Sequence, residues 1–260
     1  MKQSRQLSVA ISAAYKAGRI LMQLWKKKTI VHFKEKTEMV TAADKAAEKV
    51  ILADLRKNFP SYSIFSEEMG RADKKSDYLW VVDPLDGTTN FVIHDPFFNT
   101  AIALVYKGEV VLGVVYYPFL DEMFWAEKGK GAFMNGKRIN VSAKTDFLKS
   151  VFAFCHSGYS RLQVKRMLRI YSNLKLAGIK HLRQIGSAEL ELCYVACGRI
   201  ESFHISDLNL YDVAAGSVIV KEAGGRVTDF KGRDWKPNMK DIFASNGLVH
   251  NKLLKLINRK

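Results

Sequence analysis

The sequence predicts an α+β fold in which two halves form one integrated catalytic unit. In the first half, helical segments precede strands joined by short turns, which is typical of an antiparallel meander. In the second half, strands and helices alternate, which predicts a sheet covered by helices. The 260 residues are 48% hydrophobic, enough for a sizeable core. We place the division between the halves at 1–147 and 148–260.

The first half begins with two amphipathic helices. Apolar residues recur at helical spacing over residues 4–27, and the same pattern predicts a second helix over 42–58. Thr41 and Asp44 have the spacing of a capping box for the second helix, with Asp in place of Glu. Residues 29–40 show no clear period and are predicted to be a mobile connection.

Strands and turns make up the rest of the first half. The strands are predicted at Tyr62–Ser66, Leu79–Asp83, Phe98–Tyr106, Glu109–Tyr117 and Glu122–Glu127. A two-residue turn at Lys107 and Gly108 predicts a hairpin. Residues 71–77 are expected to be a charged loop, and residues 129–136 a turn-rich section.

The second half is predicted to alternate. Its strands are Val151–Cys155, Ile179–Gln184, Ile200–Phe203, Arg226–Asp229 and Ile242–Ser245. Its helices are Ser160–Ala177, one that begins at Gly186-Ser187-Ala188, Leu210–Glu222 and Leu248–Ile257. Together these elements predict one helix-covered sheet.

The stretch Trp80–Asn99 holds the strongest chemical signal. An apolar strand ends in Asp83, Pro84 is predicted to stop that strand, and Asp86 follows three residues after Asp83. Two carboxylates on a sharp turn after a buried strand indicate a metal site. The alternative is an Asp-Pro turn, with Asp86 as the N-cap of a short helix over Thr88–Val92.

Other acids recur at the ends of elements. Glu67 and Glu68 follow the strand 62–66, and at most one of the two is expected to face the site. Asp212 precedes an apolar helix, where a buried carboxylate needs a helix dipole or a metal as its partner. Asp44 is either a plain first-turn acid or a group near the metals.

The composition bounds the class of protein. The net charge is +15, which attracts anions, but the lysines are scattered and favour a solvated surface over a nucleic-acid face. No apolar run approaches the length of a membrane span. The three cysteines suggest neither a disulfide framework nor a zinc site. We therefore expect a cytoplasmic protein without membrane contact.

The motifs together resemble the inositol monophosphatase family of magnesium-dependent, lithium-sensitive sugar phosphatases, which includes archaeal-type fructose-1,6-bisphosphatases. The resemblance rests on D-P-L-D-G-T-T-N-F at 83–91, Glu67-Glu68, G-S-A at 186–188, and Y-D-V-A-A-G with E-A-G-G at 211–225. It covers nearly the whole chain in order and spacing. It implies a layered α-β-α-β-α fold and a homodimer.

The resemblance also implies roles for individual residues. The implied metal ligands are Glu67, Asp83, the carbonyl of Leu85, Asp86 and Asp212. The implied catalytic groups, which orient and deprotonate a water, are Glu67, Thr88 and Asp44. The implied substrate contacts are Asp86, Gly87, Thr88, Gly186, Ser187, Ala188 and Asp212.

Magnesium chemistry suits these residue types. Mg²⁺ is a hard cation that takes oxygen ligands, and two ions together stabilise the attacking and leaving oxygens of a phosphate ester. The resemblance implies two to three Mg²⁺ ions and inhibition by Li⁺. Neither His94 nor Cys155 is needed in this scheme, and both are interpreted as structural.

Two departures from the family pattern concern the substrate. Members specific for inositol phosphate carry a glutamate seven residues before the last aspartate, where this chain has Ile205, and the nearest acid is Asp207. Tyr211 stands where tryptophan is usual. A sulfonucleotide phosphatase is disfavoured, because that branch has Lys-Glu where this chain has Thr89-Asn90.

The predicted function is a phosphomonoesterase acting on a small sugar or polyol phosphate, such as inositol-1-phosphate or fructose-1,6-bisphosphate. One alternative is a relative that binds RNA or the transcription machinery, with phosphatase activity secondary. Another is a phosphatase of NADP(H) or another nucleotide. An inactive metal-binding relative is disfavoured, because Thr88 and Glu67 are both present.

Overall fold

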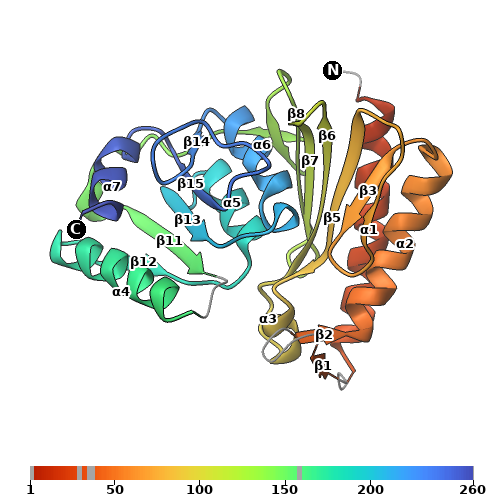
Figure 1. The fold of residues 1–260 in the computed structure, drawn as a ribbon, viewed down its shortest axis with the longest axis horizontal. Helices are drawn as coiled ribbons and strands as arrows, with labels where there is room; N and C mark the ends of the chain where they lie inside the picture. Colours follow the sequence, from red (N-terminus) through yellow and green to blue (C-terminus); the bar gives the residue numbers. More distant parts are fainter. Residues whose placement is uncertain (1–2, 28–30, 34–38, 157–159, 260) are drawn as a thin grey trace.

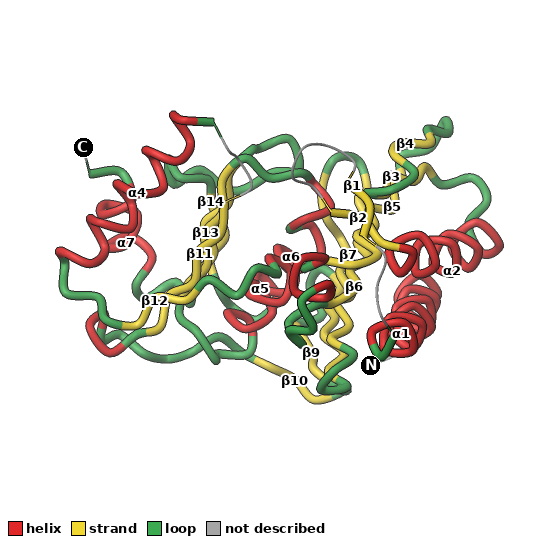
Figure 2. Tube along the Cα trace, turned by 90° about the horizontal axis from the view of Figure 1, so that it is seen from below, coloured by secondary structure: helices red, strands yellow, loops and turns green. Residues whose placement is uncertain are grey.

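The computed structural model describes residues 3–27, 31–33, 39–156 and 160–259. Five layers follow one another across the molecule (Figures 1 and 2). Helices α1 (Arg5–Trp25) and α2 (Ala42–Asn58) cover one sheet; α5 (Ala188–Ala196) and α6 (Ala214–Glu222) lie between this sheet and a second one. Helices α4 (Arg161–Leu176) and α7 (His250–Ile257) cover the outer face of the second sheet. The layered α-β-α-β-α prediction is confirmed.

The first sheet has eight strands in the order β10-β9-β8-β7-β6-β5-β3-β4. Its strands are β3 (Ser63–Ser66), β4 (Gly70–Ala72), β5 (Tyr78–Asp86), β6 (Asn99–Tyr106), β7 (Glu109–Tyr117), β8 (Glu122–Glu127), β9 (Ala132–Met134) and β10 (Lys137–Ile139). All neighbours are antiparallel except β3 and β5. The predicted meander is therefore confirmed, with one parallel pair, β3 and β5, next to the edge strand β4.

The second sheet has five strands in the order β12-β11-β13-β15-β14. They are β11 (Val151–His156), β12 (His181–Arg183), β13 (Ser202–Ser206), β14 (Arg226–Thr228) and β15 (Asp241–Ser245). The smaller elements are β1 (Val31–Phe33), β2 (Met39–Thr41), α3 (Thr88–Val92) and the 3₁₀ turns η1 (Phe147–Lys149) and η2 (Leu210–Asp212).

Alternation along β5 fills two cores. Trp80 and Val82 pack with α1 and α2, whereas Val81 packs with α5 and α6 on the other face. Since both faces are covered, the strand reads as a continuous apolar run. The core that contains Val81 includes residues of both sheets. Division of the chain into 1–147 and 148–260 stays a prediction.

The starts of α1 and α2 agree with local sequence. Ser4 caps α1 through the Leu7 amide, and Thr41 with Asp44 forms the predicted capping box of α2. Each side chain gives the first-turn amides an acceptor that the helix cannot supply.

No helix in the described parts of the chain is long and apolar enough to cross a membrane. The cytoplasmic location stays a prediction.

Three segments predicted to be loops contain strands. Within 29–40, β1 pairs with β2, and the other residues of that segment, 29–30 and 34–38, lie outside the described ones. Within 71–77, β4 is a short edge strand on β3. Edge strands often carry charged residues. The charged composition of this segment therefore resembled that of a loop, and the strand was not predicted.

The turn-rich section 129–136 also contains a strand, β9, which forms a hairpin with β10. Asn135 and Gly136 both have positive φ, 49° and 77°, as the tight turns of two-residue hairpins require.

The predicted helix 210–222 is broken at Val213, whose φ of −146° and ψ of −4° end η2 before α6 begins. Asp212 is therefore in a 3₁₀ turn, two residues before the first residue of the helix.

Candidate active site

The strand β5 continues through Pro84, contrary to the prediction. Asp83 pairs with Ala101 and Asp86 with Asn99, so three steps on β5 match two steps on β6. This is a β-bulge, in which a proline is tolerated because the extra residues make no ladder hydrogen bond. The bulge brings Asp83 and Asp86 to one side of the sheet, although residues three apart on a regular strand face opposite sides.

Asp83 lies at the centre of a group of acids. It is 4% exposed, and burial raises its pKa well above the usual value, with further increases from Glu67, Asp86 and Asp212. The charged groups that act most strongly on it are thus all negative. Like charges at a buried site destabilise one another unless a cation compensates them.

Two of these acids come from other segments. The amide of Glu67 donates to the Val82 carbonyl at 3.2 Å, which fixes Glu67 beside the end of β5. Asp212 belongs to η2, which packs on β5, and its carboxylate accepts the Asn209 amide within that turn. The structure therefore brings together Glu67, Asp83, Asp86 and Asp212, and their role as metal ligands stays a prediction.

Asp86 is held by donors of the protein. Its carboxylate accepts from Asn99 Nδ2 at 2.7 Å, Ser187 Oγ at 2.8 Å, and the amides of Ala188 and Glu189 at 3.2 and 2.9 Å. Burial raises its pKa, and these hydrogen bonds counteract the increase. Asp86 therefore caps the start of α5, and the N-cap of α3 is Gly87 instead.

Gly87 is required at the turn between Asp86 and α3. Its φ is +88°, and a Cβ there would lie 2.7 Å from the Phe97 carbonyl oxygen. A side chain would be both strained and obstructed. The turn places the first amides of α3 next to the acids, where helix amides have no partner within the helix.

Thr88 is joined to Asp44. The Thr88 hydroxyl lies 3.2 Å from Asp44 Oδ1 and 3.0 Å from the Leu85 carbonyl oxygen. The other oxygen of Asp44 accepts the Thr41 amide and hydroxyl, each at 2.7 Å. Burial raises the Asp44 pKa, and the Thr41 and Thr88 hydrogen bonds lower it. Asp44 is therefore both a capping acid and a neighbour of the site.

The Gly186-Ser187-Ala188 segment lies against Asp86. Asn90 Nδ2 donates to the carbonyls of Phe97 and Ile185, at 2.7 and 2.8 Å, which ties α3 to this segment. Ser187 is fully buried, and its hydroxyl donates to Asp86, so this side chain supports the acid. Contact of the segment with a substrate stays a prediction.

The donor set suits a hard cation. Four carboxylates and the Leu85 carbonyl provide oxygen ligands of the kind that Mg²⁺ takes. In the described residues, no three or more His, Cys, Asp or Glu side chains stand close enough to hold an ion without moving.

Ile205 and Tyr211 mark the departures from the family pattern. Ile205 is 3% exposed and packs in the core shared by the two sheets, so it presents no polar group. Asp207, the nearest acid, has a φ of +62°. The Tyr211 ring packs against Phe65, with 5.5 Å between centroids.

His94 and the cysteines fit structural roles. His94 packs on Trp25 with ring centroids 5.7 Å apart. Cys155, Cys193 and Cys197 form no disulfide, as predicted. Cys193 is fully buried, whereas Cys155 and Cys197 are partly exposed.

Two residues that support Asp86 were not predicted from the sequence. Asn99 and Glu189 are fully buried, and both contact Asp86. Each is a polar residue within an apolar stretch, and this is the signal that could have identified it. Burial raises the Glu189 pKa well above its usual value, with a contribution from Asp86.

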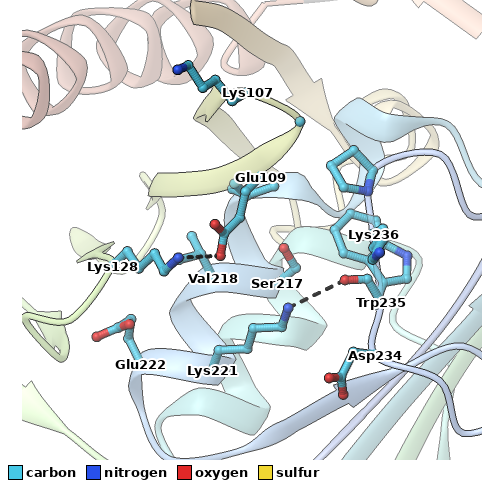
Figure 3. A pocket seen from close by; sticks show the side chains of 13 residues that line it. Lys107, Glu109, Lys128, Ser217, Val218, Lys221, Glu222, Asp234, Trp235 and Lys236 are labelled. Carbon is cyan, nitrogen blue, oxygen red and sulfur yellow. Dashed lines mark hydrogen bonds and ion pairs between the residues drawn. The ribbon is translucent and has the colours of Figure 1, made fainter. Parts of the chain in front are cut away.

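A pocket of about 470 Å³ lies away from these acids (Figure 3). It is lined by the β6–β7 turn, the C-terminal end of α6 and residues 234–237. Lysines and acids alternate around it: Lys128 pairs with Glu109 at 2.6 Å, and Lys221 reaches the Trp235 carbonyl. The positive and negative side chains of this pocket offset each other, so it lacks the concentration of negative charge found around Asp83. We therefore place the candidate site at the acids.

Comparison with known proteins places this chain among phosphoric monoester hydrolases. The model of the inositol monophosphatase family matches residues 2–260. The fructose-1,6-bisphosphatase/inositol-1-monophosphatase of Thermotoga maritima is 38% identical over 257 residues, which cover 97% of this chain and 96% of that protein. The Nus factor SuhB of Pasteurella multocida is 39% identical over 231 residues, covering 87% and 85%.

A solved structure agrees with these relatives. The extragenic suppressor protein suhB of Bartonella henselae superposes with a TM-score of 0.93 at 37% identity, covering 98% of this chain and 99% of that one. The chain belongs to the inositol monophosphatase family, which is generally metal-dependent. It is a phosphatase of the sugar-phosphate class.

Proposed function

We propose that the protein hydrolyses the phosphate monoester of a small sugar or polyol with Mg²⁺ as cofactor. The observation that carries the proposal is the convergence of Glu67, Asp86 and Asp212 on the buried Asp83. Glu67, Asp83 and the Leu85 carbonyl would hold one ion, and Asp83, Asp86 and Asp212 a second. Glu67 would also reach a third through water.

The residues around Thr88 would prepare the attacking water. When bound, the ions would neutralise the phosphate charge and lower the pKa of water. Asp44 accepts a hydrogen bond from the Thr88 hydroxyl, which leaves the threonine oxygen free to accept a hydrogen bond from water. Glu67 would provide a second acceptor for that water. The pair thus orients the water and takes part in its deprotonation.

The substrate would bind beside the same turn. The amides of Gly87 and Thr88 at the start of α3 would donate to phosphate oxygens. The part of the substrate that carries hydroxyl groups would then face residues 186–188 and Asp212. Because Ile205 provides no hydrogen bond at the position of the sugar-binding glutamate, we expect broad or altered selectivity for the leaving group.

A substrate panel tests the proposal. The purified protein is incubated with Mg²⁺ and inositol-1-phosphate, fructose-1,6-bisphosphate or NADP, and phosphate release is measured. We expect hydrolysis of at least one sugar or polyol phosphate and loss with Asp83→Asn. The matched control is Asp73→Asn, an exposed acid that pairs with Arg71. Hydrolysis of NADP alone would support the nucleotide alternative.

A role in transcription is the second candidate, because relatives named Nus factor SuhB match most of the chain. The net charge of +15 is compatible with RNA, although basic proteins bind it without specificity. Binding that disappears at moderate salt and does not depend on RNA sequence would contradict this candidate.

The remaining family properties are proposals of the same kind. Li⁺ is expected to inhibit, and phosphate release measured against Li⁺ concentration tests it. A homodimer is expected, and light scattering on the eluting protein measures its mass.

A further inference from the structure

The start of α6 lacks a cap of its own. Its N-cap residue is Val213, which makes no side-chain hydrogen bond to the helix. Apolar residues cannot satisfy first-turn amides, and the cost is large where the helix start is buried. Ala214, Ala215 and Gly216 are all buried, so the acceptor has to come from elsewhere in the fold.

Glu189 provides this acceptor from α5. The Ala215 amide donates to Glu189 Oε1 at 2.9 Å, and the Gly216 amide donates to Oε2. Gly216 permits the approach, since a Cβ there would lie 2.6 Å from Glu189 Oε2. Glu189 is fully buried, so water cannot replace it.

The backbone of the same residue holds Asp86. The Glu189 amide donates to Asp86 Oδ2 at 2.9 Å. Asp212 lies two residues before Ala214, the first residue of α6. Glu189 therefore connects Asp86 through its main chain with the segment of Asp212 through its side chain.

We propose that Glu189 is a positioning residue that sets the separation of Asp86 and Asp212, and hence the affinity of the ion these two acids share. The inference rests on the proposed metal site. Residues that support metal ligands typically change metal affinity 10- to 100-fold when they are replaced. The negative charge of Glu189 alone is not the proposed cause; the reach of its two oxygens is.

Two variants separate reach from charge. Glu189→Gln keeps the size but offers one acceptor to two amides. Glu189→Asp keeps the charge but is shorter by one methylene. Both should weaken Mg²⁺ binding 10- to 100-fold, measured by calorimetry on ion-free protein and as the Mg²⁺ concentration for half-maximal activity. At saturating Mg²⁺, kcat should return to within about threefold of the original value, because the acids themselves are present.

Glu201→Gln is the matched control. Glu201 is also fully buried and accepts a backbone amide, that of Val151 at 2.6 Å, but it lies immediately before β13 of the second sheet and pairs with Lys144. This variant should lower the melting temperature without changing Mg²⁺ affinity. A purely structural role for Glu189 would give the same result as the control.

The outcomes separate the two proposals. If the original protein binds Mg²⁺ and hydrolyses a sugar phosphate while both Glu189 variants bind Mg²⁺ within twofold of it, the positioning role is wrong and the proposed function stands. Normal affinity in Glu189→Asp alone would also overturn it, since charge would then suffice. If the original protein binds no Mg²⁺, both proposals fail. Should Glu189→Gln not fold, Glu189→Asp carries the test with the same expectation.

Discussion

Replacing Asp44 by asparagine should reverse the hydrogen bond at Thr88. In the protein, Asp44 Oδ2 accepts two hydrogen bonds from Thr41, so the carbonyl oxygen of an asparagine would take that position. Its NH₂ group would then face Thr88 and donate to the hydroxyl. The Thr88 proton would turn to the Leu85 carbonyl, 3.0 Å away, and the asparagine would occupy one of the two lone pairs of the Thr88 oxygen, so that the hydroxyl no longer presents the same acceptor geometry to water.

The expected loss is large for catalysis and small for folding. Positioned acid–base groups contribute about 10²- to 10⁴-fold to rate, so kcat should fall at least 100-fold, about 2.7 kcal/mol of transition-state stabilisation. Folding loses one favourable hydrogen-bond geometry, about 1 kcal/mol, but no longer buries a charge. The melting temperature should change little.

The assay is phosphate release at saturating Mg²⁺ and substrate, with the melting temperature measured in parallel. The matched control is Asp54→Asn, on the same helix, where the acid pairs with Lys16 at the surface. A loss of less than tenfold in Asp44→Asn would refute the orienting role of Asp44. Equal losses in both variants would refute it as well.

Three further predictions concern the same structure. Asp83→Asn should raise the melting temperature of ion-free protein, since it removes a buried carboxylate from among other acids, yet abolish stabilisation by Mg²⁺; a lower melting temperature without Mg²⁺ would contradict this. The buried His204 and His250 have pKa values lowered to about 4 by burial, below the unfolded value of about 6.5. Their stabilisation is complete above pH 6.5 and is lost as the pH falls towards 4, up to about 3 kcal/mol each; urea unfolding should show a flatter pH dependence in His250→Gln, and an unchanged slope would refute it. Gly87→Ala should destabilise by about 1–3 kcal/mol and reduce activity, because the new Cβ meets the Phe97 carbonyl; unaltered stability would show that the turn adapts.

Local signals predicted the helices well. The capping box of Thr41 and Asp44 lies within four residues, so the start of α2 was visible in the sequence. The start of α6 was not, because its cap is Glu189, 26 residues before Ala215. A helix start that depends on a distant residue has no local signature. The predicted helix therefore began too early, at Leu210.

The acids of the site were predictable as a set, since each follows an apolar strand or precedes an apolar helix. Their arrangement was not. Whether Asp83 and Asp86 face the same side depends on the register of β5 against β6, which is a property of two strands. The pairing of Thr88 with Asp44 likewise needs the turn at Gly87 and the packing of α2 on β5.

The β-bulge at Pro84 has a consequence for how this segment can change in evolution. Three steps from Asp83 to Asp86 face two steps on β6, so deleting one residue there would restore a regular ladder. The acids would remain in the sequence, but their spacing and the faces they occupy would change. Substitutions can therefore vary the chemistry of this turn gradually, whereas any insertion or deletion between the two acids removes the site in a single step.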